Sequence, residues 1–139
     1  MPNDLFLLDT SAWIMTLKKN PLAVLKNRVD HLLRINTVAI IPLVKVELLG
    51  GIKTEAEFEK LRRRLDSLIN FEINDEVWAK AARMSFNLRK AGLTIPHTDV
   101  IIAGAALVNQ AILIHIDKHF EMIASQEPLK TESLLGSLL

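Results

Sequence analysis

Four carboxylates in this chain stand out because each interrupts an apolar stretch. Asp9 ends the apolar run FLL, and Glu47 lies within the short segment LVKVELLGG. Asp99 opens the apolar segment TDVIIAGAALVN, and Asp117 follows ILIHI. An ionised carboxylate is costly to bury unless it is paired, hydrogen-bonded or bound to a metal. Each of the four therefore needs either a local structural role or a shared cation.

Each acid has a local explanation when it is taken alone. Asp9 could cap a helix that begins near Ser11, and Asp99 suits a helix N-terminus. Glu47 could point outward from an amphipathic turn, and Asp117 could be a turn residue. The occurrence of all four in apolar settings favours a shared cation instead. Oxygen ligands without a necessary histidine suit Mg²⁺ or Mn²⁺, and the chain has no cysteine.

The elements that would position these acids follow from the hydrophobic pattern. Short apolar or β-branched runs predict strands at 6–8, 37–41, 71–73 and 112–116, with a weak last strand within 129–135. Helical spacing predicts helices beginning near Ser11, over 21–35 with Pro21 in the first turn, after Pro42, over 54–69, from Asp75 to Gly92, over 98–109 and over 119–125.

Alternation of strands and helices requires crossover connections, which build a mostly parallel sheet. The sequence therefore predicts an α/β fold with about four to five short strands and helices on both faces. We expect one domain over residues 1–139, long enough to bury a core.

The carboxyl ends of parallel strands meet at one edge of an open sheet, where ligand crevices form. Asp9 and Asp117 are placed at this edge directly. Glu47 lies one short helix beyond a strand end, and Asp99 faces the same edge if its helix runs antiparallel to the strands. Four carboxylates would repel one another there. A bound divalent cation would remove that repulsion.

Composition sets wider limits on the function. The absence of cysteine excludes disulfides and thiolate zinc sites. No apolar run approaches the roughly 20 residues that span a membrane, and the N-terminus has no basic region typical of a signal peptide. We therefore expect a cytoplasmic protein with no membrane partner. A net charge of +1 neither supports nor excludes nucleic acid as a ligand.

Four segments, in this order and at these separations, resemble the PIN-domain family: LLDTSAWI, VELLGG, TDVIIAGAAL and HIDKHFEMI. The likeness is greatest to the VapC-type toxins of bacterial and archaeal toxin–antitoxin pairs. It covers about residues 5–124. The order of the segments carries the resemblance, because no single motif is decisive.

The resemblance implies a PIN-like α/β domain with an acidic, Mg²⁺-dependent ribonuclease site, with Mn²⁺ as the other candidate ion. Matched residue by residue, the acidic metal-binding positions fall on Asp9, Glu47, Asp99 and Asp117. The supporting hydroxyl position falls on Thr10, next to Ser11. The family often has Thr where this chain has His115. We assign no role to His119, because a surface residue at a helix start is the simpler interpretation.

A toxin of this type would bind RNA and a protein antitoxin. Candidate contacts to the RNA backbone are Lys18, Lys19, Arg62 and Arg63, although a basic run is more often a solvated helix face. The apolar stripes of 21–35 and 54–69 could meet an antitoxin, or could simply belong to the core. Because half of this short chain is apolar, we also expect a homodimer.

Two other functions remain open at this point. A Mg²⁺-dependent phosphatase with a strand-end aspartate nucleophile would need a second acid two residues later, where this chain has Ser11. An inactive PIN-like domain could bind RNA or a protein without chemistry, although such a module has no reason to gather buried negative charge. Incubation with RNA in Mg²⁺ or in EDTA would separate these functions from a ribonuclease.

Overall fold

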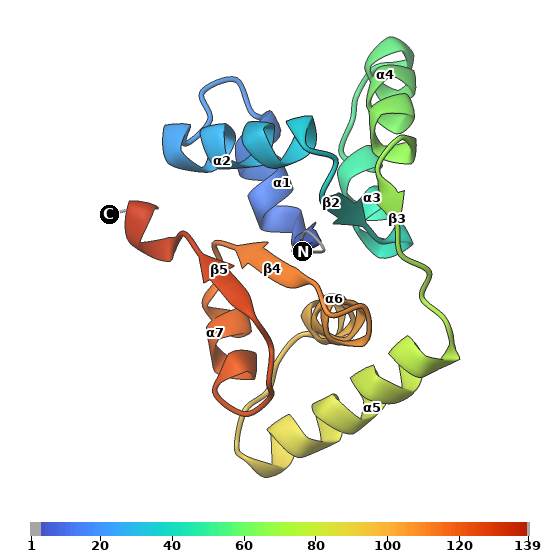
Figure 1. Ribbon diagram of the computed structural model, residues 1–139. Coiled ribbons are helices and arrows are strands. Elements are labelled where there is room, and N and C mark those ends of the chain that lie inside the picture. Colours follow the sequence, from blue (N-terminus) through green and yellow to red (C-terminus); the bar gives the residue numbers. More distant parts are fainter. Residues whose placement is uncertain (1–3, 139) are drawn as a thin grey trace.

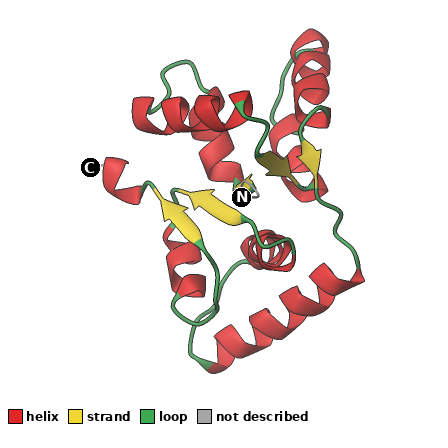
Figure 2. Ribbon diagram, in the orientation of Figure 1, coloured by secondary structure: helices red, strands yellow, loops and turns green. Residues whose placement is uncertain are grey.

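A computed structural model describes residues 4–138 of the protein, and a five-stranded sheet lies at its centre (Figures 1 and 2). Its strands are β1 (Phe6–Leu8), β2 (Val38–Ile40), β3 (Ile69–Asn70), β4 (Ile112–His115) and β5 (Thr131–Ser133). Their order in the sheet is β3-β2-β1-β4-β5, and all neighbours pair in parallel. The predicted α/β fold with a parallel sheet is confirmed.

Seven α-helices connect and cover the strands within the described residues. They are α1 (Thr10–Leu17), α2 (Ala23–Arg34), α3 (Pro42–Leu49), α4 (Glu55–Asp66), α5 (Asp75–Lys90), α6 (His97–Val108) and α7 (Lys118–Ala124), followed by a short 3₁₀ turn at Leu135–Leu138. Figure 1 shows α1 and α2 on one side of the sheet and α5, α6 and α7 on the other. The predicted covering of both faces is therefore confirmed.

The middle strand of the sheet is β1, and its register fixes where the first acid lies. Phe6 is opposite Val38 of β2 and Ile112 of β4, while Leu8 is opposite Ile114. The next backbone N–H, that of Asp9, donates to the Ile114 carbonyl oxygen at 3.2 Å. The carboxyl ends of β1 and β4 are thus hydrogen-bonded neighbours.

The apolar helix α6 packs against α5 and lies close to the sheet. Ile102, Ala103 and Ala105 in its middle are fully or almost fully buried. A Cβ added at Gly104 would lie 3.6 Å from Ala81 of α5, an ordinary van der Waals distance, so the two helices are in close contact here. This packing fixes the N-terminus of α6, which carries Asp99.

Two local predictions differ from the structure. The α2 helix begins at Ala23, so Pro21 precedes it. The third strand is Ile69–Asn70 instead of 71–73. Phe71 is buried and its N–H donates to the Ile40 carbonyl oxygen, so the apolar pattern at 71–73 reports burial just beyond the strand.

None of the helices in the described part of the chain is both long and apolar enough to cross a membrane. The single domain over 1–139 stays a prediction, since residues 1–3 and 139 lie outside the described residues.

Candidate metal centre

Asp9 lies at the end of β1 and begins α1, with only 3% of its surface exposed. Its Oδ1 accepts the Ala12 N–H at 3.1 Å, and its Oδ2 accepts both the N–H and the hydroxyl of Ser11. These bonds satisfy two of the free N–H groups of the first helical turn, those of Ser11 and Ala12. The local explanation of Asp9 as a helix cap is therefore confirmed, and the predicted support from Ser11 is a direct hydrogen bond in this structure.

Capping does not remove the electrostatic cost of this carboxylate. Burial raises the pKa of Asp9 from 3.8 to about 6, even though its bonds to Ser11 and Ala12 act in the opposite direction, and the negative charge of Asp117 raises it further. The anion is thus less favourable here than in water. A cation beside Asp9 would stabilise its ionised form and lower its pKa.

Thr10 links the first acid to the second. Its hydroxyl donates to Glu47 Oε1 at 2.8 Å, which joins the start of α1 to the middle of α3. Glu47 itself is exposed to solvent. The hydroxyl that follows Asp9 therefore orients the Glu47 carboxylate at the edge of the site.

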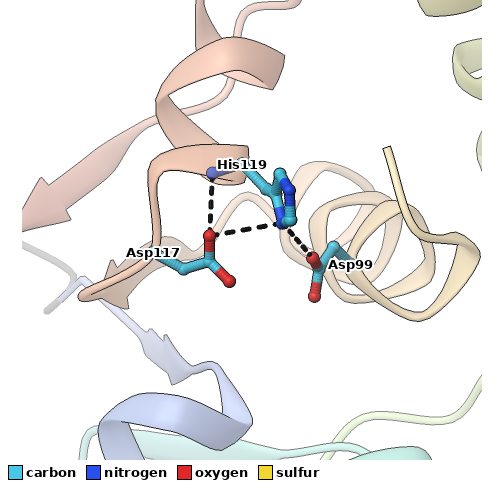
Figure 3. A group of neighbouring side chains, drawn as sticks. All are labelled: Asp99, Asp117 and His119. Atoms are coloured by element: carbon cyan, nitrogen blue, oxygen red, sulfur yellow. Dashed lines mark hydrogen bonds and ion pairs between the residues drawn. The ribbon is translucent and has the colours of Figure 1, made fainter. Parts of the chain in front are cut away.

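Asp99, Asp117 and His119 form the closest group of possible metal ligands, with their donor atoms within 4.8 Å of one another. Figure 3 shows the His119 ring between the two carboxylates. His119 Nδ1 lies 3.0 Å from Asp99 Oδ2 and 3.3 Å from Asp117 Oδ1. Asp117 also caps α7, because its Oδ1 accepts the His119 N–H at 2.9 Å. One carboxylate thus both starts a helix and faces the site.

The charges of the four acids act on one another. The pKa of Asp99 is raised by burial first and by the charge of Asp117 next; His119 opposes this rise, and Glu47 adds to it. Asp117 acts on Asp9 in the same way. Within residues 4–138, every Lys or Arg that forms an ion pair does so with an acid outside this set. The edge therefore holds negative charge that no lysine or arginine neutralises.

The buried side chain of His115 binds the backbone N–H of Asp117. Its side chain is fully buried, its Nδ1 accepts the Asp117 N–H at 3.2 Å, and its ring packs on Phe120. Because Nδ1 accepts, the proton of the neutral ring is on Nε2, which lies 3.5 Å from Glu121 Oε1. Burial lowers the pKa of His115, which favours this neutral form. A histidine in this place supports Asp117 without a hydroxyl group.

The structure brings some of the predicted residues together and leaves others apart. Asp99 and Asp117 are close neighbours, and Thr10 contacts Glu47, whereas neither Asp9 nor Glu47 belongs to the closest group of donors. His119 was not predicted for the site. The signal that could have found it is the spacing D-x-H before a helix, since a capping aspartate holds the residue two positions later beside itself.

The predicted RNA contacts lie outside this acidic group. Lys18 and Lys19 are exposed just after α1, and Arg63 is exposed on α4. The Arg62 guanidinium is bonded to Glu59 at 2.7 Å and to Asp66 at 3.0 Å. Of the four, Arg62 is thus already paired within the protein.

The chemistry of the donor set fits a divalent cation. Asp99 and Asp117 present carboxylate oxygens at one edge of the sheet, and no lysine or arginine among the described residues forms an ion pair with the four acids. Hard cations bind such oxygens and keep several water ligands. Side chains that are partly exposed, at 16% for Asp99 and 32% for Asp117, leave a route for the ion and its water.

An acidic edge on a parallel α/β sheet defines the general class, a fold with a candidate metal centre at its strand ends. Comparison with known proteins then gives the family. The PIN domain profile matches residues 6–126, which is most of the chain. The chain belongs to the PIN domain family.

Named relatives agree with this assignment. The chain is 25% identical to the ribonuclease VapC18 of Mycobacterium tuberculosis, over 91% of this chain and 93% of the relative. It is 28% identical to the ribonuclease VapC2 of Rickettsia felis, over 79% and 84%. Its fold is similar to the crystal structure of VapBC2 from Rickettsia felis bound to promoter DNA, with a TM-score of 0.77 and 23% identity over 93% of this chain and 98% of that one.

Proposed function

We propose that this chain is a divalent-metal-dependent ribonuclease and the toxin of a VapBC-type toxin–antitoxin pair. The observation that carries the proposal is the gathering of acids at the carboxyl edge of the sheet without a lysine or arginine partner. Membership of the PIN domain family and relatives named as VapC ribonucleases support it. Cellular RNA as the substrate would place the protein in the cytoplasm.

We assign the roles of the acids from their places in the site. Asp99 and Asp117 would be direct ligands, because their donor oxygens share the closest group. Asp9 and Glu47 would complete the acidic set, directly or through water, with Ser11 and Thr10 holding their carboxylates. A bound Mg²⁺ or Mn²⁺ supplies a Lewis acid that lowers the pKa of water and stabilises negative charge on the phosphate.

The rest of the work in phosphodiester hydrolysis would fall to the protein. The carboxylates would fix the ion and keep acceptors beside the attacking water, and the network from Thr10 to Glu47 would hold this arrangement before RNA arrives. Lys18 and Lys19 would contact the RNA phosphates, and Arg63 and Arg62 remain further candidates. For Arg62 this contact would require its bonds to Glu59 and Asp66 to open.

A groove between α1, α2 and α4 offers a place for a partner chain. It has a volume of about 240 Å³ and is lined by residues of α1, α2 and α4, including Trp13, Leu33 and Leu61. Most of the lining side chains are apolar, so a bound segment that presents apolar side chains would fit this groove. We propose that the antitoxin binds here, along the apolar stripes of α2 and α4.

The metal requirement gives the main test of this function. RNA cleavage by the purified protein should need Mg²⁺ or Mn²⁺ and should stop when EDTA is added, because the acids would then have no cation. Gel analysis of bulk RNA with and without each ion measures this. An Asp99→Asn preparation made in parallel controls for contaminating nuclease. Full cleavage in EDTA by the wild-type protein, with none by the variant, would refute metal dependence.

The proposed partners make a separate prediction. Sedimentation should show a homodimer of the free chain and a larger complex after co-expression with the protein encoded beside it. Leu61→Asp should weaken that complex more than a matched change outside the groove, such as Val46→Asp on the exposed face of α3. A monomer at high micromolar concentration, alone and with a co-purified partner, would contradict both assemblies.

A further inference from the structure

His119 occupies the position of a ligand in the acidic site. Its Nδ1 is 3.0 Å from Asp99 Oδ2 and 3.3 Å from Asp117 Oδ1, so one ring nitrogen faces two carboxylates from different elements (Figure 3). Ligands at adjacent corners of an octahedral ion, each about 2.1 Å from it, lie about 3 Å apart. Nδ1 therefore already has the spacing of a neighbouring ligand from each of the two oxygens, and all three atoms lie within 4.8 Å of one another.

The ring is held in this place by the backbone as well as by the acids. The His119 N–H donates to Asp117 Oδ1 at 2.9 Å, and α7 begins at the preceding residue. The side chain is 30% exposed, so solvent reaches the ring. An ion that enters between Asp99 and Asp117 would meet Nδ1 at once.

Without a metal, a proton on Nδ1 can be shared between the two carboxylate oxygens, which lie 3.0 and 3.3 Å away. A bound cation would replace that proton. The neutral ring would then carry its single proton on Nε2 and direct the Nδ1 lone pair at the space shared by the two carboxylates.

Resting on the metal-dependent function proposed above, we propose that His119 is a metal ligand through Nδ1 and that it makes this site prefer Mn²⁺ to Mg²⁺. Mg²⁺ is a hard ion that takes oxygen ligands and keeps its water, whereas imidazole nitrogen favours ions of the first transition row. The site then holds a mixed set of nitrogen and oxygen donors, in place of the oxygen-only set expected from the four acids.

The test measures metal binding without RNA. Titration of the protein with Mn²⁺, followed by the EPR signal of the free ion, gives its affinity, and competition with Mg²⁺ gives the preference. Pulsed EPR of bound Mn²⁺ detects a directly coordinated nitrogen, and ¹⁵N-labelled histidine identifies it as imidazole. In the wild type we expect a histidine nitrogen on Mn²⁺. In His119→Gln this signal should vanish, and the preference for Mn²⁺ over Mg²⁺ should fall roughly 10-fold or more.

His97→Gln is the matched control, because His97 is an exposed histidine at the start of α6, only two positions before Asp99. It should keep both the nitrogen signal and the metal preference. His119→Asn is a second variant with a shorter amide, and circular dichroism of each protein checks the fold.

The outcomes separate this inference from the proposed function. Bound Mn²⁺ without a nitrogen signal, or a signal that survives in both His119 variants, would overturn the inference while leaving the metal site in place. An equal loss of affinity for both ions in His119→Gln would also overturn it, because the residue would then act only by positioning the carboxylates. Failure of the wild type to bind either ion would overturn the inference and the proposed function together.

Discussion

Helix α4 and the carboxyl edge of the sheet both gather charged residues, but they treat them in opposite ways. On α4, Glu59 and Asp66 bind Arg62, and Lys45 of α3 also binds Asp66. The hydrogen bonds from these cations lower the pKa of each carboxyl. At the sheet edge, burial raises the pKa of Asp9 and of Asp99, and neighbouring acids add to the rise.

The two regions differ in their counter-charges, because Arg62 and Lys45 pair with the acids of α4 whereas no lysine or arginine pairs with the acids at the edge. On α4 the protein supplies its own cations, so nothing more is needed. At the edge, burial makes the ionised form of Asp9 and of Asp99 less favourable. Functional sites often hold such groups with shifted pKa values. Three substitutions test this contrast, each with a matched change on α4.

Asp99→Asn should have the largest effect. Removal of a proposed ligand should reduce RNA cleavage by more than about 100-fold, because a neutral amide is a poorer ligand for a hard cation. Without metal, the variant should melt at a higher temperature than the wild type, since the repulsion from Asp117 and Glu47 is removed. Thermal melts with and without Mg²⁺ and a cleavage assay measure these effects, and the gain in stability from Mg²⁺ should be smaller in the variant.

Asp66→Asn is the same chemical change in the paired cluster. It removes an acceptor of Lys45 and Arg62, so it should not raise the melting temperature, and cleavage should remain at the wild-type level. If Asp99→Asn and Asp66→Asn behaved alike in all these assays, Asp99 would only stabilise the start of α6, and the contrast between the two regions would be lost.

Asp9 should make the metal-free protein less stable as the pH rises. Its pKa of about 6 in the folded state is above the value of 3.8 expected for the unfolded chain, so between these values the folded state binds more protons. Stability then falls as pH rises through this window, by up to about 3 kcal/mol for such a difference. Urea unfolding at pH 4 and pH 7 measures it.

Asp9→Asn keeps a capping oxygen and removes the titration, so its loss of stability between pH 4 and pH 7 should be smaller than that of the wild type. On α4, Glu59→Gln should not reduce the wild-type slope, because the pKa of Glu59 is lowered. An Asp9→Asn protein with the full wild-type slope would show that Asp9 carries no such cost.

Thr10→Val should have the smallest effect of the three. It removes the hydroxyl that donates to Glu47 while keeping the shape of the side chain. We expect cleavage to fall roughly 10-fold, the scale for losing a group that orients a ligand. Steady-state kinetics at several Mg²⁺ concentrations measure the change.

Thr54→Val, at the N-terminal cap of α4, should affect stability and leave RNA cleavage unchanged. The Thr54 hydroxyl oxygen accepts the Glu57 N–H and caps that helix, so its loss should lower stability by about 1 kcal/mol and leave cleavage unchanged. Equal cleavage by wild type and Thr10→Val would mean that Glu47 does not need this hydroxyl.

The fold could be predicted wherever the local pattern and the tertiary burial agree. The run at 6–8, the helix after Pro42 and the apolar helix near 98–109 appear in the structure within a residue or two. The strand expected at 71–73 was misplaced, because Phe71 is buried against Ile40 without lying in the strand. An apolar pattern over three residues cannot distinguish a strand from buried residues just beyond a strand.

The site could be predicted only in part, because sequence shows residue types but not the directions of side chains. The four acids were found from their apolar settings, and their roles stay a proposal. His119 was missed since its contact with Asp99 depends on how α6 and α7 lie beside each other. The cap at Asp9 could be predicted, because aspartate is a favoured residue just before the first helical turn.

The pairing of β1 with β4 has a consequence for the timing of activity during synthesis. Leu8 of β1 lies opposite Ile114 of β4. The strand β1 is synthesised first but can pair with β4 only after β4 has been synthesised. Contacts of such long sequence separation slow folding, because the entropy of closing the loop is lost before the contacts form. A ribosome that has not yet reached residue 117 holds a nascent chain with Asp9 but without Asp117. In the site proposed above, RNA cleavage would therefore begin only after synthesis has passed the start of α7.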